Sequence, residues 1–225
     1  MRRLRWVHRL LFGYWPHRSS SAESWDWTTL VLTAALSRYA KPASHLLDMG
    51  TGSFAVLAIY AQRVLGVRTI VAVDVIPEVV RSAQAHIEGI GTPITCVCGD
   101  LFDPVVGRFD IIVMNAPYIV VARGRLLGIL RNELEIQRFS GGEHGDAVIR
   151  RFLASAPAAL STDGRVILGV NHHHLSEDRT RTVIRESFFT VVAVHRSRIT
   201  GSAAYVLHYA RPFTSESTTG AEYEP

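Results

Sequence analysis

The chain has 225 residues, of which 48% are hydrophobic, and it carries 24 basic against 20 acidic groups. This length and apolar content fit one globular domain and exclude an intrinsically disordered protein. Two cysteines are too few for a secreted domain held together by disulfides. The excess positive charge lies in the first 22 residues, which hold five arginines and no acidic residue, so the rest of the chain is close to neutral.

The composition divides the chain into three parts. A basic N-terminal arm or lid covers residues 1–24, a body covers 25–212, and a tail rich in Ser, Thr, Gly and Glu covers 213–225. We expect the tail to be disordered. The apolar run Leu10–Trp15 is too short for a secretory signal, and no stretch has the roughly 18 apolar residues of a membrane span. We therefore expect a cytoplasmic protein.

Short apolar runs rich in β-branched residues alternate with segments of helical period in the body. A first helix covers Asp26–Arg38, with Asp26 as its N-cap. The predicted strands are His45–Met49, Arg68–Val73, Ile94–Val97, Phe109–Met114, Arg165–Val170, Thr190–Arg196 and Ala203–Tyr209. The predicted helices between them are Phe54–Leu65, Pro77–Gly89, Asp146–Leu160 and Ser176–Ser187. This alternation predicts an α/β fold with a parallel sheet, which a closing hairpin makes mixed.

A glycine turn follows the first strand in the segment from Asp48 to Ser53, D-M-G-T-G-S. Gly50 and Gly52 let the backbone approach a ligand closely, and the next helix offers free N–H groups. Asp48 puts a negative charge beside this turn, which disfavours a pyrophosphate and favours a sulfonium or an ammonium group. S-adenosylmethionine carries both cations and no phosphate, so we expect it as the cofactor.

Two further acids end the next two strands. Asp74 lies 22 residues after Gly52, where a carboxylate can accept hydrogen bonds from ribose hydroxyls, and Asp100 follows the third strand in the motif G-D-L-F. Ligands of open α/β sheets bind at the carboxyl ends of the strands, so three acids at this edge predict one binding site.

The fourth strand ends in Asn115-Ala116-Pro117-Tyr118. The Asn115 side-chain carbonyl and the Ala116 backbone carbonyl can accept hydrogen bonds from an amide or amine NH2 and direct its lone pair at a methyl group. Tyr118 can stack on a planar acceptor group. These four residues form the predicted catalytic segment.

From Leu46 to about Val170 the chain resembles the class I S-adenosylmethionine-dependent methyltransferases, in the branch of the release-factor glutamine methyltransferases. The matching motifs are the glycine turn, Val73-Asp74 with Pro77-Glu78, Gly99 to Phe102, Asn115 to Tyr118, and Gly141 to Asp146. The resemblance implies a seven-stranded sheet with helices on both faces and a reversed last strand. The expected cofactor contacts are Asp48, Gly50, Thr51, Gly52, Asp74, Asp100, Leu101 and Asn115.

Two departures from the family pattern bear on the substrate. Ala116 replaces the first proline of N-P-P-Y, and an arm of about 24 residues is too short for the helical recognition domain of the release-factor enzymes. We therefore do not expect a release factor as the substrate. The chemistry of Asn115 favours N-methylation, in preference to O-methylation, of a small molecule or a peptide. The alternatives left open are a base in RNA or DNA and a non-catalytic cofactor-binding protein. A homodimer contact through the arm also stays open.

Several other residues are candidates for substrate contacts. Trp25 and Trp27 precede or begin the first body helix, where aromatic walls would exclude water from a planar acceptor. His172 begins a run of three histidines after the fifth strand, and consecutive residues cannot all point at one ion, so no metal site is expected. The segment from Arg123 to Phe139 is predicted to form a flap over the substrate.

Overall fold

The computed structural model of the protein describes residues 2–15 and 26–210, apart from the side chains of residues 2–5. Its elements in chain order are α1 (Arg2–Phe12), α2 (Trp27–Tyr39), β1 (His45–Met49), α3 (Val56–Arg63), β2 (Thr69–Asp74), α4 (Pro77–Ile90), β3 (Thr95–Cys98), β4 (Phe109–Asn115), α5 (Val121–Leu126), α6 (Glu133–Phe139), α7 (Ala147–Ala159), β5 (Leu160–Asn171), α8 (Glu177–Glu186), β6 (Phe189–Arg196) and β7 (Ser202–Tyr209). Trp25 and the predicted tail lie outside the described residues.

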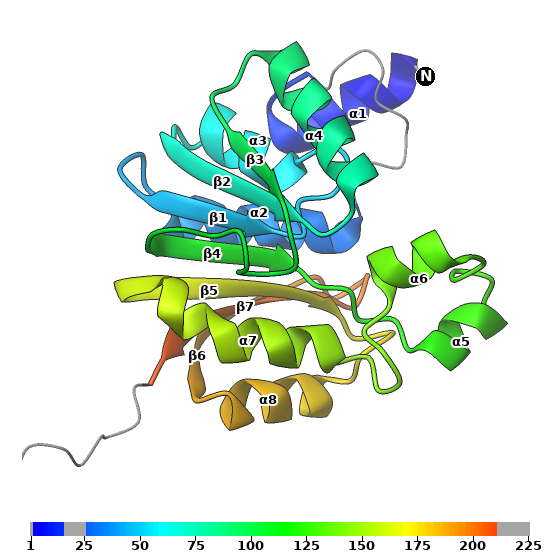
Figure 1. Ribbon diagram of the computed structural model, residues 1–225. Helices are drawn as coiled ribbons and strands as arrows, with labels where there is room; N and C mark the ends of the chain where they lie inside the picture. The colour runs from blue at the N-terminus through cyan, green and yellow to red at the C-terminus, as the bar shows by residue number, and fades with distance from the viewer. Residues whose placement is uncertain (1, 16–25, 211–225) are drawn as a thin grey trace, which may run out of the picture.

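The seven strands form one sheet in the order β3-β2-β1-β4-β5-β7-β6 (Figure 1). Strands β1 to β5 pair in parallel, whereas β7 runs antiparallel to both β5 and β6. The predicted mixed sheet with a reversed last strand is confirmed. Because β1 and β4 are adjacent, the strand order reverses between them, and this is where open α/β sheets bind ligands.

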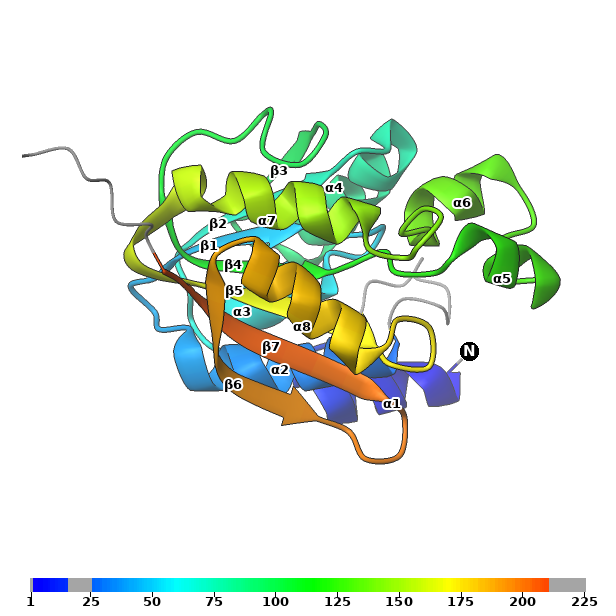
Figure 2. The same ribbon diagram turned by 90° about the horizontal axis from the view of Figure 1, so that it is seen from below.

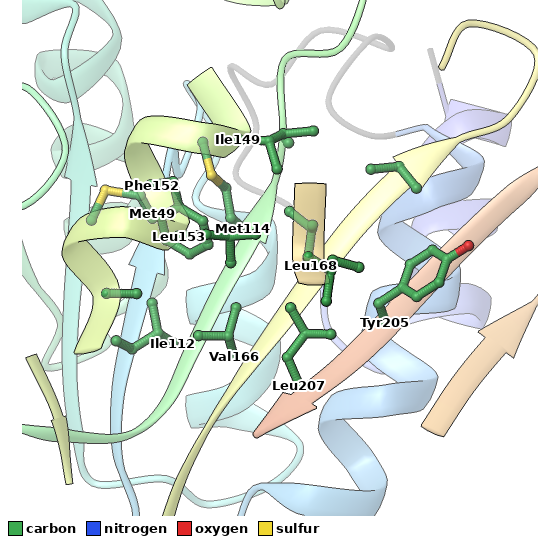
Figure 3. Packing of buried hydrophobic residues seen from close by; sticks show 14 of the residues in the cluster. Met49, Ile112, Met114, Ile149, Phe152, Leu153, Val166, Leu168, Tyr205 and Leu207 are labelled. Carbon is green, nitrogen blue, oxygen red and sulfur yellow. The ribbon is translucent and has the colours of Figure 1, made fainter. Parts of the chain in front are cut away.

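Helices cover both faces of the sheet, as Figures 1 and 2 show. The alternation along β4 illustrates how this arises, since successive side chains of a strand point to opposite faces. Ile112 and Met114 are buried with α7 and α8, whereas Ile111 and Val113 are buried with α2 and α3. Figure 3 shows the first of these cores, to which α7, β1, β4, β5 and β7 contribute side chains. Its labelled side chains are Met49, Ile112, Met114, Ile149, Phe152, Leu153, Val166, Leu168, Tyr205 and Leu207.

The predicted strands and helices of the body are present, with shifts at their ends. Helix α3 begins at Val56 rather than at Phe54, because Ala55 has a left-handed conformation at φ 44° and ψ 42°. Strand β5 begins at Leu160, which pairs with Phe109, and not at Arg165. A register shift lies between the first two pairs of this ladder, so the polar residues before Arg165 do not disrupt the strand.

Three helices of the structure were not predicted from the sequence. Helices α5 and α6 form most of the predicted flap, and α1 lies within the predicted arm. Phe12 and Tyr14 are buried in the same core as residues of α2 and α3, so this part of the arm packs on the body. None of the helices in the described part of the chain is long and apolar enough to cross a membrane.

Candidate active site

The glycine turn joins β1 to α3 at the carboxyl edge of the sheet. Gly50 and Gly52 have left-handed φ angles of 70° and 67°, which a residue with a side chain rarely adopts. The N–H groups of Gly50 and Thr51 both donate to the carbonyl of Val73, at 2.8 and 2.9 Å, so the turn is held against the end of β2. A Cβ atom added at either glycine would meet no atom within 4 Å, so the backbone there is open to a ligand.

Asp48 is buried at the base of this turn. Its Oδ2 accepts hydrogen bonds from the Thr51 hydroxyl at 2.7 Å and from the Ala58 N–H at 3.2 Å, whereas its Oδ1 is buried without a partner among the described residues. Burial raises the pKa of Asp48 to about 6, against the effect of these two hydrogen bonds. A buried carboxylate oxygen without a donor is a site for a ligand that brings a positive charge or an N–H group.

Asp74 ends β2 on the other side of the turn. Its Oδ2 accepts a hydrogen bond of 3.0 Å from the Gly52 N–H, and its Oδ1 accepts one of 3.1 Å from the Ile76 N–H. Burial raises the pKa of Asp74, while these bonds and the charge of Arg138 act in the opposite direction. Asp74 is therefore placed beside the turn as predicted, and Arg138 in α6 lies within electrostatic range of it.

Asp100 lies at the same edge but has a different environment. Its Oδ2 accepts a hydrogen bond from the guanidinium of Arg151 at 2.6 Å, and both side chains are partly exposed. Leu101 has a left-handed φ of 49°, and the next residue, Phe102, stacks on Phe152 at 5.6 Å. The loop is thus anchored to α7, and only one of the three predicted acids is paired with an arginine.

Asn115, the last residue of β4, is tied to the start of α2. Its Nδ2 donates a hydrogen bond of 3.2 Å to Oδ1 of Asp26, and its Oδ1 is buried with no partner among the described residues. Asp26 also caps α2 as predicted, since Oδ1 accepts from the Thr29 N–H at 2.8 Å. The amide of Asn115 therefore offers an unpaired acceptor at the end of the strand.

Tyr118 is buried beside Asn115. Its hydroxyl lies 3.5 Å from Oδ2 of Asp26 and 3.3 Å from the Thr28 hydroxyl. Its ring stacks on His174, with centroids 6.1 Å apart and planes 22° apart. Burial, followed by the charge of Asp26, raises the pKa of Tyr118, so the phenol is neutral. One face of the ring predicted to stack on an acceptor is covered by His174.

The loop after Tyr118 is braced by the turn that precedes α7. The Gly141 N–H donates to the Ile119 carbonyl at 3.0 Å, and the Val121 N–H donates to the Gly142 carbonyl at 3.3 Å. Ala116 and Pro117 connect this braced segment to β4, and the Ala116 N–H donates to the Gly169 carbonyl at 3.2 Å. Helices α5 and α6 extend from the braced loop, on the side to which the β4 arrow points (Figure 1).

The residues predicted to contact the substrate, Trp27 and His172, have different environments in the structure. Trp27 is exposed at the start of α2, next to Asp26. Both ring nitrogens of His172 are engaged within the fold, one with the Leu175 carbonyl and one with the Tyr205 hydroxyl, each at 3.0 Å. His174 is the histidine that lies against Tyr118, and burial lowers its pKa. Among the described residues, no three His, Cys, Asp or Glu side chains cluster as metal ligands do.

The structure brings together residues from the ends of β1, β2 and β4 and from the start of α2. Two members of this site, Asp26 and His174, were not predicted as site residues. The sequence identifies Asp26 only as a helix cap, because nothing in its local spacing relates it to a residue 89 positions later. The third predicted substrate residue, Trp25, lies outside the described residues.

Comparisons with known proteins agree with this arrangement. The methyltransferase small domain family matches residues 19–125. The ribosomal protein uL3 glutamine methyltransferase of Bordetella pertussis is 36% identical over 130 residues, which cover 56% of this chain and 43% of that protein. The release factor glutamine methyltransferase of Geobacter sulfurreducens is 33% identical over 139 residues, which cover 61% of this chain and 48% of that protein.

A solved structure with the same fold is the 16S rRNA N2 G1207 methyltransferase of T. thermophilus in complex with AdoMet and guanosine. Its TM-score is 0.60 at 21% identity, and the match covers 84% of this chain and 45% of that chain. This chain spans less than half the length of the three proteins described. The predicted resemblance is confirmed: the chain has the class I methyltransferase fold and is similar to the methyltransferase small domain family and to glutamine methyltransferases.

Proposed function

We propose that this chain transfers a methyl group from S-adenosylmethionine to a nitrogen atom of a peptide or a small molecule. The observation that carries the proposal is the Asn115 amide, whose donor is bound by Asp26 and whose buried acceptor has no partner among the described residues. An unpaired buried acceptor costs about 1–3 kcal/mol, and an N–H group of a bound acceptor would remove this cost.

The residues around the glycine turn fit the proposed cofactor. The unpaired Oδ1 of Asp48 suits a cationic group, Asp74 lies at the end of the neighbouring strand, and the backbone at Gly50 and Gly52 is open. When bound, S-adenosylmethionine supplies a methyl group on a sulfonium whose carbon–sulfur bond breaks as the acceptor nitrogen attacks. The AdoMet bound to the rRNA methyltransferase of the same fold supports this assignment.

In the proposed mechanism the residues of the chain position the acceptor and stabilise charge. Asn115 Oδ1 and the backbone carbonyl of Ala116 accept the two N–H bonds of the acceptor, so its lone pair is directed at the methyl carbon. These carbonyls also stabilise the positive charge that builds up on nitrogen, before the nitrogen releases a proton to solvent. Tyr118 supplies a neutral aromatic wall beside the acceptor.

The names of the relatives favour an amide nitrogen as the acceptor. Both curated relatives described above are glutamine methyltransferases that act on proteins of translation, a release factor and ribosomal protein uL3. A carboxamide is planar and carries two N–H bonds, which matches the two carbonyl acceptors of the proposed mechanism. We therefore favour a glutamine-containing peptide over a small amine as the substrate. We also propose that this chain acts in the cytoplasm.

Calorimetry with S-adenosylmethionine tests the cofactor. The wild-type chain should bind it, and Asp74→Ala should weaken binding by roughly tenfold or more, as expected for the loss of a charged hydrogen-bond acceptor. The matched control is Asp163→Asn, an exposed acid outside the site. The absence of heat with the wild-type chain, or equal affinity in Asp74→Ala, would contradict the proposal.

Methyl transfer to short synthetic peptides that contain glutamine tests the acceptor. Asn115→Ala should lower turnover roughly 100-fold or more and leave cofactor affinity unchanged. Gln84→Ala is the control, since Gln84 is an exposed amide residue in α4, outside the site. Full turnover in Asn115→Ala would show that this residue does not hold the acceptor.

The second candidate acceptor is a base in RNA or DNA. It is favoured by α1, which carries arginines and no acid in its first turn, and by the rRNA substrate of the solved structure with the same fold. Binding through the arm would weaken steeply with salt and would be lost when Arg2, Arg3 and Arg5 are replaced by glutamine, a change that keeps the buried Phe12 and Tyr14. Salt-independent methylation of a peptide would decide against this candidate.

A further inference from the structure

The hydrogen bonds of Asp26 link the start of α2 to the end of β4. Oδ1 of Asp26 accepts from the Asn115 amide at 3.2 Å and from the Thr29 N–H at 2.8 Å, and Oδ2 lies 3.5 Å from the Tyr118 hydroxyl. One carboxylate thus contacts both polar side chains of the predicted catalytic segment.

The geometry allows only one orientation of the Asn115 amide. A rotation that exchanged its oxygen and nitrogen would place the amide oxygen against the carboxylate of Asp26, where two acceptors repel each other. It would also place the NH2 group of Asn115 at the buried position that Oδ1 now occupies, where its two N–H bonds would have no acceptor among the described residues. The carboxylate therefore selects the orientation that leaves the acceptor free, although this orientation leaves a buried oxygen unpaired.

From these contacts we infer that Asp26 is a positioning residue for methyl transfer, which orients the Asn115 amide so that Oδ1 receives an N–H bond of the acceptor. This inference rests on the proposed function. Asp26 itself touches neither the acceptor nor the cofactor in this role. The same residue caps α2, so its two roles must be separated by experiment.

Two substitutions separate capping from positioning. Serine caps helices as well as aspartate does but is too short to reach both Thr29 and Asn115, so Asp26→Ser keeps the cap and removes the link. Asparagine caps equally well and has a carbonyl at the position of Oδ1, so Asp26→Asn keeps both. Its amide nitrogen would donate to the Tyr118 hydroxyl, which can still donate to Thr28.

The side-chain NH2 resonances of Asn115 report on this link without cofactor or acceptor. They are assigned in 15N-labelled protein by their loss in Asn115→Ala. We expect them to shift, and to exchange faster with water, in Asp26→Ser but not in Asp26→Asn. With a glutamine-containing peptide as the acceptor, kcat should fall roughly 10–100-fold in Asp26→Ser with little change in cofactor affinity, and Asp26→Asn should stay close to wild type.

The outcomes that overturn the inference are distinct from the failure of the proposed function. Unchanged Asn115 resonances in Asp26→Ser would show that Asp26 does not hold the amide. Equal losses of kcat in Asp26→Ser and Asp26→Asn would show that the charge matters and not the orientation. If the wild-type chain binds no S-adenosylmethionine, the proposed function fails, and the resonances still decide whether Asp26 positions Asn115.

Discussion

The carboxylate of Asp48, at the end of β1, accepts a hydrogen bond of 3.2 Å from the backbone N–H of Ala58, in the first turn of α3. No side chain at the N-cap position of α3 forms such a bond, so Asp48 takes the place of a capping residue. The residue proposed to meet the cationic cofactor also stabilises the helix that follows the glycine turn.

The raised pKa of Asp48 predicts an unusual pH dependence of stability. Because the pKa of Asp48 is about 6 in the folded chain, against an ordinary aspartate value of 3.8 in the unfolded chain, the folded state binds the proton more tightly. Its contribution to the free energy of unfolding therefore increases as pH falls from above 6 towards 4, by on the order of 3 kcal/mol. Asp48→Asn should remove this dependence and stabilise the chain at pH 8.

Urea unfolding at pH 8 and pH 5 measures this effect, with Asp163→Asn as an exposed control. The same Asp48→Asn variant should bind S-adenosylmethionine more weakly than wild type, because it lacks the negative charge. Stability at pH 8 that falls in Asp48→Asn would show that the ionised carboxylate is not destabilising.

The backbone conformation of Ala55 predicts that glycine at this position would stabilise the chain. It is a non-glycine residue at φ 44° and ψ 42°, a conformation that costs about 1 kcal/mol or more for a residue with a Cβ atom. Ala55→Gly should therefore raise the free energy of unfolding by roughly 1 kcal/mol. Ala58→Gly, in the helical part of α3, should lower it by at least that amount. A loss of stability in both variants would show that the Ala55 methyl group matters more for packing than for strain.

The lowered pKa of His8 predicts a second pH dependence of stability, opposite in sign to that of Asp48. It is buried in α1 against Phe12 and Tyr14, and burial lowers its pKa from 6.5 to about 4. Only the unfolded state takes up the proton as pH falls from 6.5 towards 4, so stability from His8 is lost in this range.

The variant Asp48→Asn removes the opposing contribution of Asp48. In that background we expect the free energy of unfolding to fall between pH 7.5 and pH 5, because His8 and His174 both have lowered pKa values, and His8→Phe should reduce the fall while keeping the ring contacts. His144→Gln, at an exposed histidine, is the control and should leave the fall in place. A fall of unchanged size in His8→Phe would assign the pH dependence to groups other than His8.

Gly141 lies in a tightly packed turn, so replacing it should show whether this turn supports the site. An added Cβ atom would lie 2.2 Å from the Gly145 carbonyl oxygen, so Gly141→Ala must open the turn that braces the loop after Tyr118. We expect a loss of roughly 1–3 kcal/mol in the free energy of unfolding, together with reduced methyl transfer. Gly91→Ala, at the C-cap of α4 and outside the site, also places a side chain at a left-handed φ, 71°, but the added Cβ would meet no atom within 4 Å, so it should cost some stability and leave methyl transfer unchanged. Equal methyl transfer by both variants would show that the turn does not support the site.

The sequence predicts the sheet well because buried strands have a strong local signal. The run Phe109–Met114 predicts β4 to within one residue, and the glycine turn predicts where β1 ends. Helix α1 was missed because His8 and Arg9 interrupt its apolar residues, although His8 faces the core. An imidazole buried among aromatic rings does not follow the usual pattern of polar and apolar residues.

The sequence predicts the position of a candidate site residue where its motif lies within one segment, and it does not predict contacts between distant segments. Asp48, Asp74 and Asn115 each lie at the carboxyl end of a strand, and parallel strands bring such residues to one edge. The pairs Asp26–Asn115 and Tyr118–His174 depend on how α2 and the loop after β5 pack at that edge. Their partners are far apart in the sequence, so local spacing contains no information about them.

The bond between Asp26 and Asn115 also bears on how the chain folds. It joins two residues that are 89 positions apart, with β1, β2 and β3 between them and Asn115 as the last residue of β4. Closing a loop of this length costs conformational entropy, and contacts of long sequence separation slow the folding of a domain. A nascent chain that has not yet reached Asn115 therefore lacks the proposed acceptor site.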